Sequence, residues 1–364
     1  MKDSTIKVLV GLVFLAFTAV LYSGVSDLAL SGKNDFVPLY VAAQLSGGPD
    51  LYNAQRYQDF QLAQFGEFNE SLRFTRLPFY ALLLKPLGLL SYGRAHLIWF
   101  LLRLGVVIAF VLVWPQGSRG DVALVACLSL PIVAALANGQ DTLLLLFFVT
   151  LAVRWEPTRP AVAGLILSLC AIKFHLFVLL PLLLLAQKRW PMLQGFLAGG
   201  VILLALSFLS AGVKWPAEYF HTLTDGRVHP SISMMPNLHG LFSNAPLEIA
   251  FSLLMLGAAW VAMQRTNFLL GLAVALTGGI LLSYHAFLAD CVLLTPVVLI
   301  LFAQTRVAWL KLLGVLLVSP LLSLMLLSPR PYSYAMQAAL LVFFFGLAFV
   351  LPRGEHRPLE AKPA

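Results

Sequence analysis

The sequence of 364 residues is poor in charge: only 11% of its residues are Asp, Glu, Lys or Arg, whereas 60% are hydrophobic. Its mean hydropathy is +0.88. A soluble domain of this length cannot bury so much apolar side chain, so the composition indicates a polytopic membrane protein. The net charge of +8 then reflects basic loops on the cytoplasmic side, and we expect no nucleic-acid partner.

Motifs of nucleotide and metal chemistry are also missing. The sequence contains no P-loop, Rossmann glycine pattern, HExxH or CxxC pair, and no Ser/His/Asp set with recognisable spacing. ATP-driven transport and metal hydrolysis therefore lack support, and we expect neither a cofactor nor a metal. The three cysteines, Cys127, Cys170 and Cys291, lie in apolar segments and are expected to pack. No internal repeat is visible, which counts modestly against a repeat-built transporter.

Apolar segments predict an all-α fold with about twelve transmembrane helices (11–13). They cover residues 7–26, 93–114, 121–137, 141–154, 160–173, 174–187, 191–212, 247–264, 267–286, 289–304, 306–327 and 332–351. Several are shorter than the roughly 20 residues that a full span prefers. The first lacks a cleavage site and is expected to be a retained anchor. Gly195 and Gly199 form a GxxxG pattern that predicts close helix packing. We expect one transmembrane domain over residues 1–352 and a cytoplasmic tail at 353–364.

Basic residues orient the predicted spans. The turns at Arg306, Arg265 and Lys188 fall on the same side as both termini, provided that residues 77–92 do not cross the membrane. We therefore interpret 77–92 as an interfacial or re-entrant helix. It ends a mostly polar first outer loop, residues 27–92. A second outer loop covers residues 213–246.

This topology places polar residues from five chain regions on the outer face. They are Asp35, Arg76, the turn Asn138-Gly139-Gln140-Asp141, Lys173 with His175, the loop with Arg227, His229, Asn237 and His239, and the turn from Tyr284-His285 to Asp290. Structural roles are open for several of them. Asp35 and Asp141 could each cap the helix that follows. Lys173 could be an anchor at a span end, where a cation costs little.

Four stretches, in chain order, carry a resemblance to a known family. They are Asn34-Asp35-Phe36 with Tyr40, Ala42-Ala43, Gly47-Gly48 and Leu51-Tyr52; Arg76-Leu77-Pro78-Phe79 with Lys85-Pro86-Leu87; Asn138-Gly139-Gln140 with Ala163-Gly164-Leu165 and Ala171-Ile172-Lys173; and Tyr284-His285 through Asp290. Together they resemble the polytopic C-type glycosyltransferases, most of all glycosyltransferase family 87. The family usually has a double proline where this chain has Leu77-Pro78, which leaves the role of Arg76 open.

The resemblance implies a C-type fold with interfacial helices in the first outer loop and a donor sugar carried on polyprenyl phosphate. It also implies an acidic residue of that loop as general base, which by position is Asp35. Cations would stabilise the leaving phosphate, and the candidates are Lys173, Arg76 and His285, in that order. His285 could instead relay the proton. Further substrate contacts are expected from Asn138, Gln140, His175, His239, Asp290 and Tyr40.

These expectations describe an inverting hexosyltransferase-type enzyme. It would move a mannose-like hexose or a pentose from the polyprenyl-phosphate donor to a hydroxyl of a glycolipid or glycan acceptor. It would lie in a bacterial inner membrane, with both termini cytoplasmic and the site on the outer face. Two alternatives stay open: a transporter or flippase of a lipid-linked sugar, and a polysaccharide polymerase or ligase.

Overall fold

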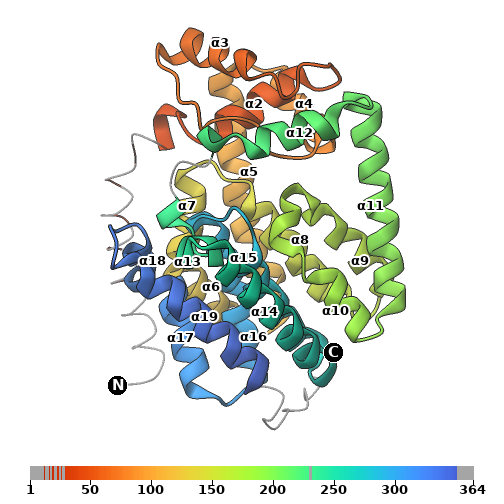
Figure 1. Cartoon of the computed structure of the whole chain (residues 1–364), viewed down its shortest axis with the longest axis vertical. Coiled ribbons are helices and arrows are strands. Elements are labelled where there is room, and N and C mark those ends of the chain that lie inside the picture. Colours follow the sequence, from red (N-terminus) through yellow and green to blue (C-terminus); the bar gives the residue numbers. More distant parts are fainter. Residues whose placement is uncertain are drawn as a thin grey trace. The chain divides into compact units, whose positions relative to one another are not determined.

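The computed structural model describes residues 29–228 and 232–350 continuously, with isolated positions before residue 29. All regular elements in these residues are helices (Figure 1). The predicted first span, 7–26, lies outside the continuously described chain. The predicted tail, 353–364, and His229 of the second outer loop lie outside the described residues.

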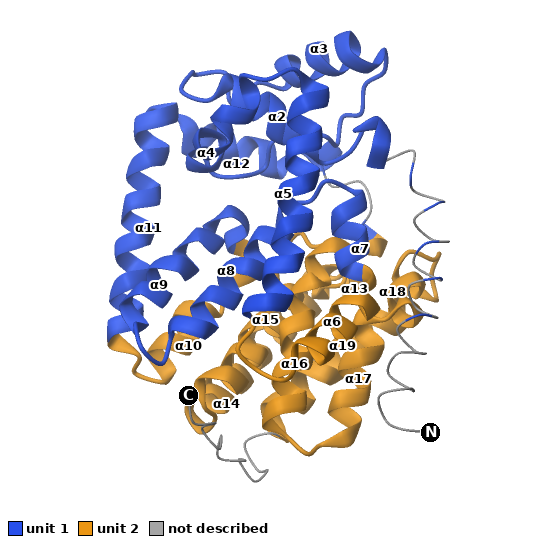
Figure 2. Cartoon of the chain, turned by 180° about the vertical axis from the view of Figure 1, so that it is seen from behind, with its two compact units in different colours: residues 1–113, 131–174, 191–232 blue, residues 114–130, 175–190, 233–364 orange. Residues whose placement is uncertain are grey.

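The chain divides into two compact units, which Figure 2 shows in different colours. Unit 1 comprises residues 1–113, 131–174 and 191–232, and unit 2 comprises residues 114–130, 175–190 and 233–364. The single domain that we predicted over residues 1–352 stays a prediction.

The helices of unit 1, some of which reach a residue or more past its borders, run as follows: α2 (Phe36–Leu45), α3 (Ala54–Phe65), α4 (Pro78–Gly88), α5 (Tyr92–Val113), α7 (Leu130–Ala137), α8 (Thr142–Trp155), α9 (Pro160–Ser168), η1 (Leu169–Phe177), α11 (Trp190–Ala211), α12 (Trp215–Thr224) and η2 (Gly226–Val228). Those of unit 2 are α6 (Arg119–Leu128), α10 (Leu180–Ala186), η3 (Ile232–Met234), α13 (Leu238–Phe242), α14 (Ala245–Arg265), α15 (Phe268–Leu282), η4 (Leu288–Leu293), α16 (Leu294–Gln304), α17 (Ala308–Val318), α18 (Pro320–Leu326) and α19 (Ser333–Phe349).

Four described helices are long and apolar enough to cross a membrane: α5, the run Pro160–Phe177, α11 and α14. Two bent pairs, α6 with α7 and α17 with α18, raise the number to six if each pair is one span. The described chain is therefore an all-α membrane protein, but its helices do not establish the twelve spans that we predicted. The predicted border between spans at residues 173 and 174 coincides with a break in η1, where the backbone of Lys173 leaves helical geometry; that this break separates two spans stays a prediction.

The segment predicted to be interfacial forms α4, which has only 11 residues. Pro78 begins it, where the missing N–H of proline costs no helix hydrogen bond. Its last residue, Gly88, lies so close to α2 that an added Cβ would come within 2.8 Å of the Ala43 carbonyl carbon. Two helices of 10 and 11 residues thus pack backbone to backbone. At about 1.5 Å per residue neither is long enough to cross the bilayer.

Helices α9 and α11 of unit 1 also pack closely. A Cβ on Gly164 would overlap the carbonyl oxygen of Met192, and a Cβ on Gly195 would overlap that of Ala161. One on Gly199 would overlap the Ser168 hydroxyl. The predicted packing role of Gly195 and Gly199 is confirmed.

The interior of unit 2 is built around α15 and α16. Almost every residue of α15 is buried, which is typical of a helix surrounded by other helices. Of the cysteines, Cys291 and Cys170 are buried and Cys127 is half-buried, and all three are free thiols. Their predicted packing role is consistent with this burial.

Candidate functional site

Helix α2 begins directly after Asp35, but the Asp35 carboxylate does not cap it. The neighbouring Asn34 does so instead, because its side-chain oxygen accepts from the Phe36 N–H at 3.0 Å. The backbone N–H of Asp35 donates to the carbonyl of Asn138 at 3.0 Å. The capping interpretation of Asp35 is wrong, and its carboxylate is available for another partner.

That partner comes from the turn between α7 and α8. Gly139 adopts a φ of +72°, and a Cβ there would lie 2.6 Å from the side-chain oxygen of Asn34. Only glycine satisfies both conditions without strain. Trp99 fixes the turn from the other side by donating from its indole nitrogen to the Gly139 carbonyl at 2.8 Å. The turn therefore packs directly against residues 34–36.

A buried arginine holds the end of α7 in place. Arg103 is fully buried, although it lies within the apolar helix α5. Its guanidinium donates to the carbonyls of Ala135 and Leu136, in the last turn of α7, at 2.8 and 2.9 Å. Our sequence analysis missed Arg103 and Trp99. A charged residue inside an apolar span was the available signal, because such residues are costly there.

Gln140 of this turn connects Asp35 to Lys173. Its amide nitrogen donates to the Asp35 carboxylate, and its amide oxygen accepts from the Lys173 ammonium at 2.8 Å. An ammonium can only donate, so Lys173 fixes which end of the amide faces Asp35. Lys173 also donates to the Thr142 hydroxyl at 2.9 Å. The backbone of Lys173 departs from helical geometry (φ −129°, ψ 61°), so its side chain projects from a kink between two helical segments.

Asp141 contacts both cations of this cluster. Its oxygens accept from the Nε and Nη2 atoms of Arg76 at 2.9 and 3.2 Å, and one lies 3.4 Å from the Lys173 ammonium. Its side chain is 1% exposed, that of Lys173 3% and that of Arg76 12%. No side-chain cap forms at α8, so the capping interpretation of Asp141 is also wrong. Two carboxylates and two cations balance in one small volume.

The pKa of Asp35 is raised above its ordinary value of 3.8, mainly because burial penalises the charged carboxylate. The Lys173 charge, the Gln140 hydrogen bond and the Arg76 charge each act to lower it, and the Asp141 charge acts to raise it. Asp35 itself keeps part of its surface accessible. Such a carboxylate is a stronger proton acceptor than an exposed aspartate.

Two other predicted site residues of unit 1 are Tyr40, five residues after Asp35, and Asn138, two residues before Gln140. Tyr40 is buried in an aromatic cluster with Phe36, Phe60 and Tyr92, and its hydroxyl donates to the Leu90 carbonyl at 2.6 Å. This contact ties the end of α4 to α2. Asn138 contributes its backbone carbonyl to Asp35. Their predicted contacts with substrate remain predictions.

The remaining predicted residues belong to unit 2. The rings of His175 and His285 lie edge to face with 6.4 Å between centroids. His239 contacts the Glu248 carboxylate at 3.1 Å, and Asp290 accepts from the Phe287 N–H at 2.9 Å and so caps η4. The structure thus brings His175 and His285 together. Their predicted meeting with Lys173 remains a prediction, since Lys173 belongs to unit 1.

Among the described residues, no group of three His, Cys, Asp or Glu side chains is arranged to hold a metal ion. The expectation that no metal takes part stays a prediction.

A sequence model of glycosyltransferase family 87 matches residues 74–320, more than half of the chain. The matched part contains Arg76, Gln140, Asp141 and Lys173 but begins after Asp35. No curated protein and no solved structure matches the chain.

Proposed function

The chain belongs to glycosyltransferase family 87, and on this premise we propose that it transfers one sugar from polyprenyl phosphate to an acceptor hydroxyl with inversion at the anomeric carbon. The sugar is a mannose-like hexose or a pentose, and the acceptor is a glycolipid or glycan. Asp35 is the general base.

One observation carries this assignment. The Asp35 carboxylate does not cap its own helix, is partly accessible and is oriented by Gln140 from a different part of the chain. A carboxylate held in this way can receive a proton without first breaking a helix cap. Its raised pKa brings its basicity closer to what proton abstraction near neutral pH requires.

The reaction is a single displacement. The acceptor oxygen attacks the anomeric carbon while its proton passes to an Asp35 oxygen. The bond between the anomeric carbon and the phosphate oxygen breaks, and polyprenyl phosphate leaves with the bonding electrons. Attack opposite to the leaving group inverts the anomeric centre. Positioning both substrates in line supplies a large part of the rate.

Lys173, Arg76 and His285 are the proposed cations for the leaving phosphate. Lys173 and Arg76 already contact Asp141, so an arriving phosphate must share them with that carboxylate. Lys173 has a second proposed effect. Through the Gln140 amide it orients the hydrogen bond to Asp35 and favours the charged form of that carboxylate.

The proposed setting is a bacterial inner membrane, with both termini in the cytoplasm and Asp35 on the outer face. We propose a C-type fold with about twelve spans, in which α2, α3 and α4 form an interfacial platform. The product would serve envelope glycolipid biosynthesis.

The decisive experiment uses the purified chain in detergent with a panel of polyprenyl-phosphate sugars and glycolipid acceptors. Release of polyprenyl phosphate coupled to acceptor glycosylation is the expected result. Because detergent removes any membrane gradient, transfer under these conditions would exclude transport as the only activity. Lipid-linked sugar movement in vesicles without any transfer would instead favour a flippase.

A further inference from the structure

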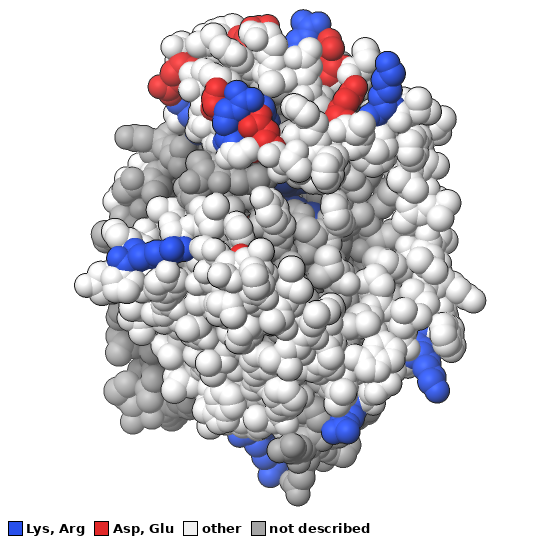
Figure 3. Space-filling view, viewed as in Figure 1, with Lys and Arg blue, Asp and Glu red and all other residues white. Residues whose placement is uncertain are grey.

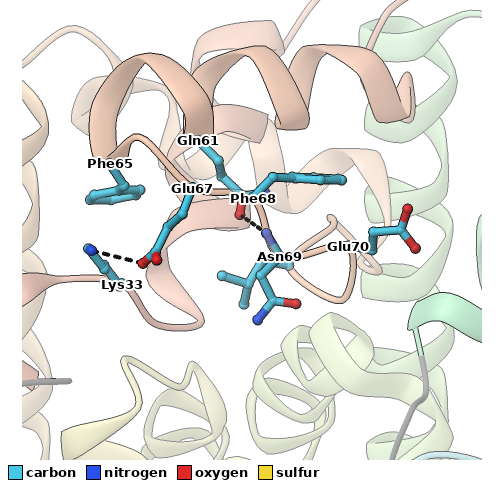
Figure 4. A pocket seen from close by; sticks show the side chains of 8 residues that line it. Lys33, Gln61, Phe65, Glu67, Phe68, Asn69 and Glu70 are labelled. Atoms are coloured by element: carbon cyan, nitrogen blue, oxygen red, sulfur yellow. Dashed lines mark hydrogen bonds and ion pairs between the residues drawn. The ribbon is translucent and has the colours of Figure 1, made fainter.

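Unit 1 contains a pocket of about 440 Å³ between the end of α3 and the loop that follows it (Figure 4). Its walls include the rings of Phe65 and Phe68 and the polar side chains of Gln61, Glu67 and Glu70. The volume falls within the range of about 300–1,000 Å³ that is usual for small-molecule sites. Nothing in the proposed reaction so far uses this pocket.

The loop that forms the pocket is held by specific contacts. The Asn69 N–H donates to the Gln61 amide oxygen at 3.0 Å, and the Asn69 side chain accepts from the Ser71 N–H at 3.0 Å. Further along, Arg73 donates to Asp225 at 2.8 Å, which ties the loop to the end of α12. The pocket is therefore a shaped feature of the fold.

The lining has the chemistry of a sugar site. Carboxylates accept hydrogen bonds from hydroxyls, and amide groups both accept from them and donate to them. Aromatic rings offer a flat apolar surface to the C–H face of a sugar ring. The Lys33–Glu67 ion pair at its edge spans 2.8 Å, with side chains 42% and 66% exposed. Such an exposed pair is weak, so a ligand hydroxyl can replace either partner.

The electrostatics oppose a phosphate in this pocket. Glu67 and Glu70 contribute two negative charges, against one positive charge from Lys33. Arg227, 3.7 Å from Glu70, is already paired with Asp225 at 2.7 Å. Figure 3 shows acidic and basic side chains side by side on the part of unit 1 that carries α3 and α12, so the negative balance belongs to the pocket's own lining. A neutral, hydroxyl-rich ligand suits this surface better than the anionic head of the donor lipid.

Gln61 supplies an independent sign of a ligand. Its side chain lines the pocket, the residue is only 2% exposed, and its amide nitrogen has no hydrogen-bond partner among the described residues. A buried donor without an acceptor is unfavourable. A ligand hydroxyl oxygen that accepts from this nitrogen would satisfy it.

The pocket also lies close to the base along the chain. Lys33 precedes Asp35 by two residues, so their Cα atoms are at most about 7 Å apart. We propose that the pocket binds an uncharged sugar unit of the acceptor and thereby presents the neighbouring hydroxyl to Asp35. This proposal rests on the proposed function and names the part of the chain that selects the acceptor.

The test measures binding of simple methyl glycosides, such as methyl mannoside, to the full-length protein in detergent by saturation-transfer NMR. Glu67→Gln and Phe68→Ala are expected to weaken binding about tenfold. Asp59→Asn, which removes a carboxylate from α3 outside the pocket lining, is the matched control and should leave binding unchanged. Thermal unfolding of each variant confirms that the fold is retained.

Kinetics separate this proposal from the proposed function. The two pocket variants should raise KM for the acceptor and leave KM for the donor and kcat unchanged. A raised donor KM instead, or unchanged glycoside binding in both variants, would overturn the acceptor subsite while leaving sugar transfer intact. Glycoside binding that depends on Glu67 and Phe68 in a protein without transferase activity would support the pocket and refute the proposed function.

Discussion

Gln140 donates a hydrogen bond to the carboxylate of Asp35, although 105 residues separate the two in the chain. The same amide accepts from Lys173, so the buried ammonium of Lys173 orients the amide that donates to the proposed base. Because Asp141 and Asp35 together balance Lys173 and Arg76, the cluster can be buried without an uncompensated charge.

Replacement of the base should remove most of the activity. Asp35→Asn keeps the shape of the side chain but cannot accept the acceptor proton, and a positioned general base contributes about 10²- to 10⁴-fold. We expect kcat to fall by that factor, while the protein stays in the membrane and still binds the donor. The measurement is polyprenyl-phosphate release by the purified variant. Transfer at the wild-type rate would exclude Asp35 as the base.

The pH dependence of the enzyme should report on Asp35. A base acts only when deprotonated, so activity falls as the pH drops through its pKa. Since burial raises that pKa, the acid limb of kcat/KM should lie above 3.8, the ordinary value for aspartate.

Gln140→Leu should move this limb further. The substitution removes a hydrogen bond that favours the charged carboxylate, so the pKa of Asp35 rises and the limb shifts to higher pH. Loss of a hydrogen bond to a charged group also costs about 1.5–3 kcal/mol, or about 10- to 100-fold in kcat/KM. Asp59→Asn serves as control and should leave the limb in place. An unshifted limb in Gln140→Leu would show that Gln140 does not act on the base.

The role of Lys173 can be determined from substrate binding and from the pH profile of kcat/KM, both measured on Lys173→Ala. If Lys173 holds the leaving phosphate, donor binding weakens by about 10- to 100-fold, and acceptor binding changes less. Its effect through Gln140 also shifts the acid limb upward. We expect both changes. Unchanged donor binding together with a shifted limb would leave Lys173 with only its effect on Asp35.

The close approach of α9 and α11 can be tested with two glycines. Gly164→Ala places a methyl group against the Met192 carbonyl, and overpacking of this kind costs about 1–3 kcal/mol. Gly200 lies on the same α11 helix with no atom within 4 Å of an added Cβ. Gly200→Ala should therefore be neutral or stabilise by about 0.5–1 kcal/mol. Thermal unfolding in detergent distinguishes the two, and equal effects would contradict the packing interpretation.

Part of the site could be predicted from residue types and charge placement. Topology alone put Asp35, Arg76, the turn at residues 138–141 and Lys173 on one face, and the structure brings them into contact. The capping roles considered for Asp35 and Asp141 were wrong because capping signals are local, whereas both carboxylates take partners distant in the chain. The number of spans was not established, since several apolar segments form short or bent helices.

By itself the sequence determined the membrane class, the helical fold and the family, because apolar runs and ordered motifs are properties of the chain alone. Only the tertiary structure decided what each charged group does. It pairs Asp141 with Arg76 and Lys173, places the Gln140 amide against Asp35 and directs the Arg103 guanidinium to the last carbonyls of α7. The physical reason is that the energy of a buried charge depends on the partners within a few ångströms of it, and those partners come from segments far apart in the chain.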